Sequence, residues 1–337
     1  MTTAAVMGAG SWGTAFAAMC ADAGTTTTLW SRDPDQVAEI AERRTNAAYL
    51  PDVTLPEPLG ATDDPEEAVA GADVVVIAIP STGVVEQLTN WGSRIAPEAT
   101  IVSLVKGVDV ASRRFGSQLI AGTVDVDPDR VVVISGPNLA AECARRQPAA
   151  TVSASPDLGR AEQVQAMVMS GYFRVYTNRD KVGVEVAGAA KNVMALAAGM
   201  AHGMGFGDNT KAMVVTRGLA EMTRLGVALG GQPLTFSGLA GVGDLVATCT
   251  SPRSRNRTVG ERLGQGEALD DIIASMNMVA EGVKSSQAIL GIAADVGVDM
   301  PLARGVVGVC HEGLDPAEMV GQLMTRSAKT ELYGIES

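Results

Sequence analysis

The 337-residue chain has little of the chemistry on which metal centres and disulfide frameworks depend. It contains two histidines and four cysteines, and the cysteines lie far apart with no Cys-x-x-Cys pair. These numbers argue against a structural zinc site and against a disulfide-stapled fold. We therefore expect no bound metal.

Positive charge and long apolar runs are also scarce. Lys and Arg number 26 against 38 Asp and Glu, a net charge of −12, which argues against binding to nucleic acid or to anionic membranes. The N-terminal "MTTAAVMGAG" has no basic region, and no run approaches the roughly 20 apolar residues that cross a bilayer. The composition is that of a globular protein, and we expect a cytoplasmic location without membrane insertion.

The first half of the chain alternates short apolar runs with helical stretches. Several runs, such as "DVVVIAIP" and "RVVVISGP", are continuous in Val and Ile, which is typical of strands buried on both faces of a parallel sheet. This alternation predicts βαβ units in an α/β, Rossmann-type, doubly wound, mostly parallel sheet. The expected strands are 4–8, 25–30, 73–80, 100–107 and 130–137, with 149–155 and 173–178 as extensions, and the expected helices are 11–24 and 34–44.

After residue 180 the β-branched runs give way to Ala, Gly, Leu and Met at helical spacing. Two long helices are expected, over 182–203 and 209–230, and a last helix is predicted from Asp315 as N-cap with Pro316 and Glu318 behind it. A chain of this length is expected to form two domains. We place a dinucleotide-binding domain at 1–180 and an all-helical substrate and catalytic domain at 181–337.

The segment "VMGAGSWGTA" contains three glycines, Gly8, Gly10 and Gly13, in the spacing G-x-G-x-x-G. They follow the first strand and open the first helix, which is the context that turns a weak triplet into a dinucleotide signal. Gly8 permits the tight turn, Gly10 lets the backbone approach a pyrophosphate, and Gly13 lets helix and strand pack closely. The alternative is a glycine loop without a ligand.

The second strand ends in "LWSRD", where such sites usually carry an acidic residue that bonds the ribose. Arg32 stands there instead and can pair with a 2′-phosphate, so we expect NADP(H) without excluding NAD(H). Stacking on the adenine and simple exposure are the alternatives for Arg32.

Lys191 is the only charged residue between Glu185 and Asp208, within "VEVAGAAKNVMALAAGMAHGMG". An unpaired buried ammonium costs several kcal/mol, so this lysine needs an anion or a lowered pKa. Asp244, in "GVGDL", is a candidate partner, although an aspartate after glycine often caps a helix. Lys106 ends an expected strand at the carboxyl edge of the sheet, where such folds bind ligands. The alternative for Lys191 is a side chain that reaches solvent.

The segment "SPRSRNR" places three arginines within five residues of one another, interleaved with Ser254 and Asn256. These donors ahead of a helix suit a phosphate monoester. A solvated polar loop is the second interpretation. Nucleic acid is a third, and the net charge argues against it.

Taken together, "GAGSWGTA", "GAAKNVMALAAG", "GLAGVGDL", "SRNR" and "MVAEGV" resemble the bacterial NAD(P)-dependent glycerol-3-phosphate dehydrogenases, over nearly the whole chain. The resemblance implies catalytic roles for Lys191, Lys106 and Asp244. It implies cofactor contacts from Ser11, Trp12, Arg32, Lys106, Ala140, Arg255, Val279 and Glu281. It implies substrate contacts from Lys106, Gly136, Asn138, Lys191, Asn192, Asp244, Thr248, Ser254, Arg255 and Asn256. Many relatives carry Ser-Phe where this chain has Asn138-Leu139, which puts the contact at 138 in question.

The expected reaction is the reversible NAD(P)H-dependent reduction of dihydroxyacetone phosphate to sn-glycerol 3-phosphate, which supplies phospholipid synthesis. Lys191 would donate the proton, and a homodimer is the default assembly. Two alternatives remain at this point. One is a ketoacid reductase of the ketopantoate reductase or β-hydroxyacid dehydrogenase type, whose substrates do not require the arginine cluster. The other is a non-catalytic sensor of nucleotide redox state, which has no use for Lys191 and Asp244.

Overall fold

A computed structural model describes residues 2–276, 280–328, 330–331 and 333–334. The chain divides into two compact units, the first made of residues 1–105 and 116–181 and the second of residues 106–115 and 182–337. The sequence predicted a single boundary at 180/181. That boundary does not describe residues 106–115, which precede it in the chain but belong to the second unit. None of the helices in the described part is both long and apolar enough to cross a membrane.

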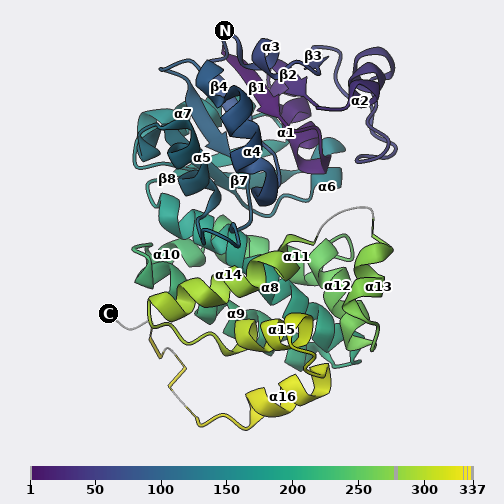
Figure 1. Ribbon diagram of the computed structural model, residues 1–337, viewed down its shortest axis with the longest axis vertical. Helices are drawn as coiled ribbons and strands as arrows, with labels where there is room; N and C mark the ends of the chain where they lie inside the picture. The colour runs from purple at the N-terminus through teal and green to yellow at the C-terminus, as the bar shows by residue number, and fades with distance from the viewer. Residues whose placement is uncertain (1, 277–279, 329, 332, 335–337) are drawn as a thin grey trace. The chain divides into compact units, whose positions relative to one another are not determined.

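The first unit is built on an eight-stranded sheet in the order β3-β2-β1-β4-β5-β6-β7-β8 (Figure 1). All neighbours pair in parallel except β6 and β7, which pair antiparallel. The doubly wound, mostly parallel sheet expected from the sequence is thereby confirmed. The strands are β1 (Thr3–Met7), β2 (Thr26–Trp30), β3 (Leu59–Thr62), β4 (Val74–Ile77), β5 (Thr100–Ser103), β6 (Val131–Ser135), β7 (Ala149–Ala154) and β8 (Phe173–Asn178).

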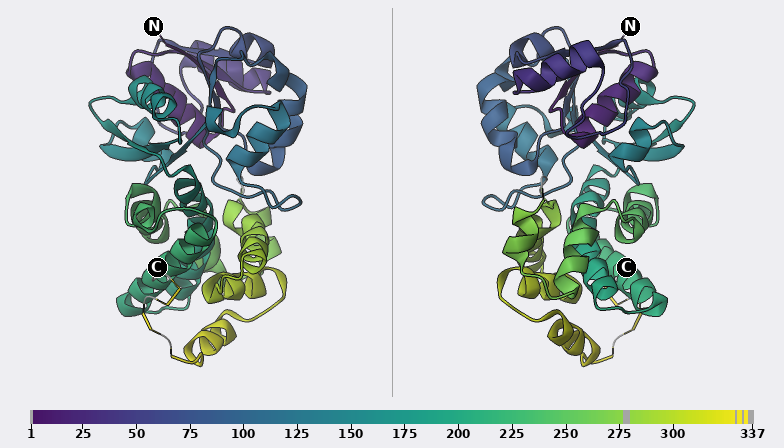
Figure 2. Two further views of the ribbon diagram at one scale, coloured as in Figure 1. Left: turned by 90° about the vertical axis from the view of Figure 1, so that its left-hand side faces the viewer. Right: turned by 90° about the vertical axis from the view of Figure 1, so that its right-hand side faces the viewer.

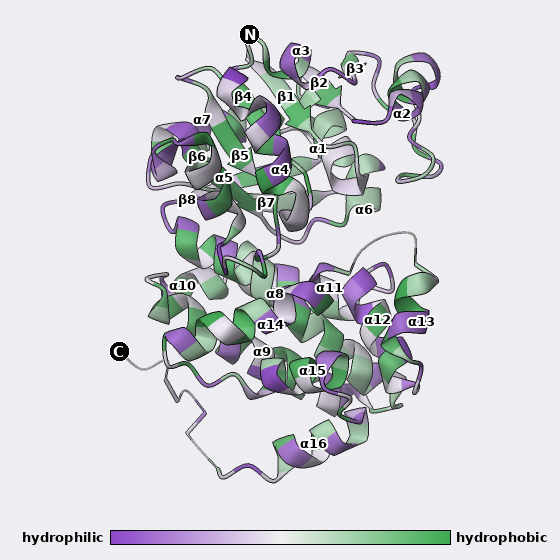
Figure 3. Cartoon of the chain, in the orientation of Figure 1, coloured by the Kyte–Doolittle hydropathy of each residue, from purple (hydrophilic) through white to green (hydrophobic). Residues whose placement is uncertain are grey.

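Each central strand is buried on both faces, which explains its unbroken run of Val and Ile (Figure 3). Along β4, Val74 and Val76 belong to one core, which includes residues of α1 (Ser11–Asp22) and α7 (Leu158–Val168). Val75 and Ile77 belong to another, which includes residues of α3 (Pro65–Val69), α4 (Ser81–Trp91) and α5 (Gly116–Val124). Helices thus cover both faces of the sheet (Figure 2).

Three features of this unit differ from what the sequence predicts. Strand β3, "LGAT", was not expected, because it is four residues long, contains a glycine and has a single β-branched residue. The expected strand 100–107 ends at Ser103, so Lys106 does not lie on it and belongs to the second unit. The expected helix 34–44 divides into α2 (Pro34–Ala38) and a π-helical turn, Glu39–Arg43.

The second unit is helical, as expected. Its long helix α8 (Lys181–Gly203) is buried continuously from Gly183 to Ala201. It is followed by α9 (Asp208–Ala228), α10 (Pro233–Phe236), α11 (Asp244–Thr250), α12 (Arg255–Gly264), α13 (Leu269–Ala274), α14 (Glu281–Asp295), α15 (Pro301–His311) and α16 (Pro316–Met324). Asp315 caps α16, accepting hydrogen bonds from the backbone amides of Ala317 and Glu318, as its sequence predicts.

Glycines let α8 and α12 approach each other to backbone contact. A Cβ on Gly199 would lie 2.1 Å from the carbonyl oxygen of Arg257, and one on Gly260 would lie 2.1 Å from that of Leu196. Each helix therefore needs a residue without a side chain where it faces the other. This close crossing holds the start of α12, with its polar cluster, against the helix that carries Lys191.

Candidate functional site

The glycine-rich turn of the first unit has the geometry that a dinucleotide requires. Gly8 has a φ of +123°, and a Cβ on Gly13 would lie 1.9 Å from the carbonyl oxygen of Gly8, so both positions require glycine. A Cβ on Gly10 would meet nothing within 4 Å, which leaves open space over the backbone there. Helix α1 begins at Ser11, directly after this turn. Its first amides are therefore placed to bind an anion.

A side-chain network that sequence reasoning missed holds this turn in place. The carbonyl of Ala9 accepts hydrogen bonds from Gln36 Nε2 at 2.8 Å and from Asn46 Nδ2 at 3.0 Å. Asn46 Nδ2 also lies 2.8 Å from Thr14 Oγ1, in α1. The hydroxyl of Ser31, at the end of β2, donates to Gln36. A polar residue in a short helix and another in the loop that follows give no sequence signal for this role, because their partners are 27 and 37 residues away.

The side chains expected to touch the cofactor have different surroundings. Ser11 Oγ donates to the carbonyl of Tyr49 at 2.9 Å, which ties the start of α1 to the loop after α2. Trp12 packs edge-on against Phe16 with 5.9 Å between ring centroids. Arg32 is exposed, directly after β2. An exposed guanidinium at this strand end is available to a ligand phosphate.

The segment after β6 contains three further expected residues, Gly136, Asn138 and Ala140. Ala140 is the first residue of the short helix α6 (Ala140–Ala144). Asn138 Nδ2 donates to the carbonyl of Ala150 at 2.9 Å, so the amide fastens this loop to β7. The side-chain amide of Asn138, which the sequence suggested as a donor to the substrate, thus already donates a hydrogen bond to the backbone.

In the second unit two lysines share one carboxylate. Lys191 Nζ lies 2.6 Å from Asp244 Oδ1, and Lys106 Nζ lies 2.7 Å from Asp244 Oδ2. Lys191 Nζ is also 2.7 Å from Thr248 Oγ1. Lys191 is 7% exposed and Asp244 is 2% exposed, so this centre lies almost wholly inside the unit. The lysine that looked out of place in the sequence therefore has the anion it needs.

Burial and charge act in opposite directions at this centre. Burial lowers the pKa of Lys191 to about 8, with Lys106 adding to the effect and Asp244 opposing it. For Asp244, burial favours the neutral form, but the two lysines outweigh it and the pKa of the carboxyl is lowered. The result is an ionised aspartate beside an ammonium that gives up its proton near neutral pH. Such a pair can orient and supply an acid.

An amide relay links this centre to α12 and α14. Asn192 Nδ2 donates to the carbonyl of Lys106 at 2.9 Å, and Asn256 Nδ2 donates to Asn192 Oδ1 at 3.0 Å. Asn256 Oδ1 accepts from the amide of Gly282 at 2.9 Å. Sequence reasoning expected both asparagines at the substrate, and the structure brings them together with Lys106. It also gives them a structural role, because their hydrogen bonds fasten the segment of Lys106, α12 and α14 to α8.

Two expected substrate residues have other partners. Ser254 is the N-cap of α12, and its hydroxyl accepts from the amide of Arg257 at 3.3 Å. Thr248, expected to contact the substrate, accepts a hydrogen bond from Lys191 and donates one to the carbonyl of Asp244 at 2.6 Å. Both hydroxyls therefore organise the site from within.

The arginine cluster is less uniform than its sequence indicates. Arg257 pairs with Glu261 at 3.2 Å along α12, whereas Arg253 and Arg255 are exposed. Arg255 is the first residue of α12 and Glu281 the first of α14. Val279, the remaining expected cofactor contact, lies outside the described residues. Arg255 thus lies exposed at a helix N-terminus, where backbone amides attract anions.

A glycine-rich turn at the head of a doubly wound sheet, followed by a helical unit with a buried lysine–aspartate centre, is typical of nicotinamide-dependent dehydrogenases. The family described as NAD-dependent glycerol-3-phosphate dehydrogenase matches this chain with its N-terminal part over residues 3–161 and its C-terminal part over residues 180–321. The chain belongs to this family.

Relatives and solved structures agree. The chain is 52% identical over 332 residues to the glycerol-3-phosphate dehydrogenase (NAD(P)+) of Corynebacterium jeikeium, covering 98% of this chain and all of that protein. The protein of that name from Mycobacterium leprae is 51% identical, covering 97% of each chain. The crystal structure of glycerol-3-phosphate dehydrogenase from Coxiella burnetii superposes with a TM-score of 0.90 at 36% identity, covering 96% of this chain and 99% of that one.

Proposed function

We propose that this protein catalyses the reversible reduction of dihydroxyacetone phosphate to sn-glycerol 3-phosphate with NADPH or NADH, and so supplies glycerophospholipid synthesis. The observation that carries the proposal is the buried contact of Lys191 with Asp244 and Lys106, in a chain of the glycerol-3-phosphate dehydrogenase family. A ketone reductase needs an acid at the carbonyl oxygen, and this centre supplies one.

In the proposed reaction a nicotinamide cofactor held by the glycine-rich turn would supply a hydride to the carbonyl carbon of the substrate. The electron pair of the C=O π bond moves to oxygen, which takes a proton from the Lys191 ammonium. Lys191 is left as a neutral amine and is reprotonated from solvent before the next turnover. General acid catalysis of this kind contributes about 10²–10⁴-fold in rate. Oxidation of the alcohol runs through the same steps in reverse, with neutral Lys191 as the base.

Substrate recognition is assigned by the same proposal. Arg255 binds the phosphate, aided by the N-terminal amides of α12, and Lys106 contacts both nicotinamide and substrate. The remaining substrate residues are Gly136, Asn138, Asn192, Asp244, Thr248, Ser254 and Asn256. Because the side chains of Asn138, Thr248 and Ser254 already have protein partners, we assign them to positioning rather than to the first contact with substrate.

Cofactor binding is assigned to the glycine-rich turn, with Ser11, Trp12, Ala140 and Glu281. Exposed Arg32 pairs with the 2′-phosphate of NADPH, so NADP(H) is used at least as well as NAD(H). A cytoplasmic location and a homodimer belong to the same proposal. Sedimentation of the purified protein tests the dimer.

Two other functions account for less of the structure. Ketopantoate reductase from Ralstonia eutropha shares the fold with a TM-score of 0.57, but at 17% identity this likeness concerns the fold alone. A carboxylate substrate also does not call for the basic cluster "SPRSRNR" at the start of α12. A nucleotide sensor without turnover has no use for the buried lysine–aspartate centre.

The test is the loss of reduced-nicotinamide absorbance on adding dihydroxyacetone phosphate, measured in parallel with NADPH and NADH. Rapid oxidation of either nucleotide supports the proposal. A protein that binds NADPH but oxidises neither nucleotide with this ketone would rule it out, and ketoacids would be tested next. Turnover of a ketoacid would support the reductase alternative, and nucleotide binding without any turnover would support the sensor.

Variants then separate the roles of the two cations. Lys191→Met keeps the volume of the side chain and removes the ammonium, so kcat should fall at least ~10²-fold while NADPH affinity is retained. Arg255→Ala should raise KM for dihydroxyacetone phosphate much more than for unphosphorylated dihydroxyacetone, whereas Arg262→Ala, at the other end of α12, should change neither. Near-normal kcat in a folded Lys191→Met protein would contradict the acid role. Equal effects of Arg255→Ala on both ketones would contradict the phosphate contact.

A further inference from the structure

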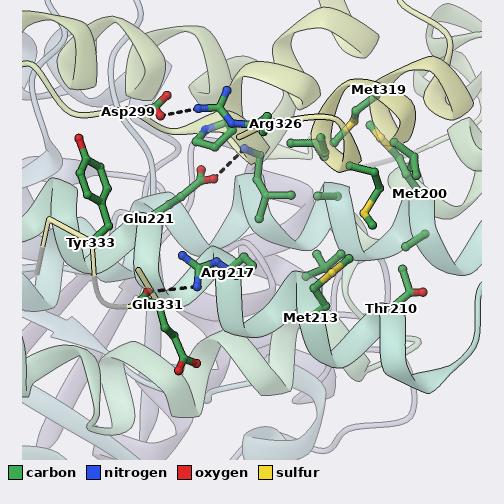
Figure 4. A pocket seen from close by; sticks show the side chains of 18 of the residues that line it. Met200, Thr210, Met213, Arg217, Glu221, Asp299, Met319, Arg326, Glu331 and Tyr333 are labelled. Carbon is green, nitrogen blue, oxygen red and sulfur yellow. Dashed lines mark hydrogen bonds and ion pairs between the residues drawn. The ribbon is translucent and has the colours of Figure 1, made fainter. Parts of the chain in front are cut away.

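The second unit has a partly open cavity of about 320 Å³ that the proposed reaction does not use. Helices α8, α9, α15 and α16 line it together with the C-terminal residues that follow α16 (Figure 4). Among the described residues that line it, none is one of the substrate or cofactor residues proposed above. The cavity therefore needs an explanation of its own.

One end of the cavity is apolar and rich in methionine. Met200 and Met204 come from α8, Met213 from α9, and Met319 and Met324 from α16. In Figure 4 the labelled Met200, Met213 and Met319 side chains gather on the same side of the pocket. Methionine is unbranched and adapts to ligands of irregular shape. This end therefore suits a flexible hydrocarbon.

At the other end two of the three lining carboxylates, those of Glu221 and Asp299, already have partners. Glu221 accepts hydrogen bonds from the amides of Leu302 at 2.7 Å and Ala303 at 3.2 Å, at the start of α15. Asp299 is paired with Arg326 at 2.6 Å. Burial also raises the pKa of Glu221 to about 7, so part of its population is neutral near physiological pH. The Glu221 side chain therefore repels an incoming anion only weakly.

Two guanidinium groups at this end are bonded to neutral carbonyls. Arg217 donates to the backbone oxygen of Glu331 at 3.3 Å, and Arg224 donates to those of Tyr333 at 3.5 Å and Asp299 at 3.3 Å. These distances are long for hydrogen bonds, and a guanidinium has five donors. A carboxylate is the partner that such a group binds more strongly. The polar end is thus complementary to an anion.

The two ends are connected along one face of α9. Met213, Arg217, Glu221 and Arg224 follow one another at intervals of three or four residues, so they lie on one side of the helix. Eleven residues separate the first from the last, about 16 Å at the rise of an α-helix. At ~30 Å³ for each non-hydrogen atom, the cavity holds on the order of ten such atoms. The volume of the cavity matches a chain of medium length.

From this complementarity we propose that the cavity binds a medium-chain fatty carboxylate, with its head on Arg217 and its chain among the methionines. This inference is independent of the reaction proposed above. The cavity offers an anion site at one end and an apolar tube at the other. A phosphorylated sugar would leave the apolar end unused, and a neutral alkane would leave the arginine unused.

The experiment is calorimetric titration of the full chain with decanoate and with decanol, each kept below its aggregation threshold. Saturating NADPH and glycerol 3-phosphate are present, so that binding in the active site is blocked. We expect saturable binding of decanoate with a stoichiometry of one, and binding of decanol at least tenfold weaker. No binding of decanoate, or its displacement by NADPH and glycerol 3-phosphate, would overturn the proposal.

Two variants locate the ligand. Arg217→Gln should weaken decanoate about tenfold and leave decanol unchanged, because it removes a charge-assisted hydrogen bond that only the carboxylate can form. Met213→Asp should weaken both ligands, because it places a carboxylate at the apolar end. Met213 is 43% exposed, so a polar substitution is compatible with folding. Lys211→Gln, on the same helix outside the cavity, is the matched control, and decanoate affinity unchanged in both test variants would refute the assignment.

Discussion

Replacing Asp244 by asparagine removes the charge that two lysines share while it preserves the shape of the side chain. Each carboxylate oxygen lies within 2.7 Å of an ammonium nitrogen, and the side chain is 3% exposed. In the Asp244→Asn protein, Lys191 is left in a buried environment without an anion. Removing one partner of a buried ion pair costs about 3–5 kcal/mol in the free energy of unfolding. We expect a loss of that size at about pH 7.

This loss should depend on pH in a direction set by Lys191. Its pKa is lowered from 10.5 to about 8, so between these values the folded chain binds fewer protons than the unfolded chain and the free energy of unfolding rises with pH. Without Asp244 the pKa of Lys191 falls further, which makes the variant least stable relative to the wild type at and below neutral pH. Towards pH 10 the lysine is neutral in both proteins, and the difference should shrink.

Urea unfolding followed by circular dichroism at pH 7 and pH 10 measures both quantities. Asp270→Asn, which removes an exposed carboxylate at the start of α13, is the control and should change the free energy of unfolding by less than about 0.5 kcal/mol. If Asp244→Asn costs less than about 1 kcal/mol at pH 7, or costs the same at pH 10 as at pH 7, the account of a buried ammonium held by one carboxylate is wrong.

Three further predictions concern the cofactor turn and the helix crossing. Asn46→Ala should raise KM for NADPH about tenfold with little change in kcat, because the glycine-rich turn loses a support; an unchanged KM in initial-rate assays would contradict this. Arg32→Ala should raise KM for NADPH more than KM for NADH, and equal changes would exclude the 2′-phosphate contact. Gly199→Ala places a Cβ 2.1 Å from the carbonyl oxygen of Arg257 and should cost about 1–3 kcal/mol in thermal unfolding. Gly321→Ala, where a Cβ meets nothing within 4 Å, should cost nothing; similar melting temperatures for the two variants would contradict the close crossing.

Several features could be predicted because their causes are local in the chain. The central strands are predictable from unbroken Val and Ile runs, since burial on both faces of a sheet requires apolar side chains at every position. The glycine-rich turn is predictable because strand, Gly8-x-Gly10 and helix follow one another directly. Lys191 was conspicuous for a similar reason, because a single charge in an apolar helix needs a partner wherever the helix is buried.

Other features depend on residues that meet only after folding. Strand β3 forms because β2 offers it a parallel partner, and its own four residues have no strong strand preference. The supports of the glycine turn, Gln36 in α2 and Asn46 in the loop beyond it, are polar residues whose sequence context does not indicate their partner. The cavity of the second unit is of the same kind, since four helices and the C-terminal residues have to converge before it exists.

The sequence by itself determined which chemistry is available: a nucleotide turn, one lysine set in an apolar helix, and a basic cluster in an acidic chain. Tertiary structure decided how these groups are used. It drew residues 106–115 into the helical unit, so that Lys106 and Lys191 share Asp244 across 138 and 53 residues of chain. It also made Ser254 a helix cap and Asn138 a backbone tether. Periodicity reports the local burial of a segment, whereas hydrogen-bond partners are chosen by distance in the folded chain.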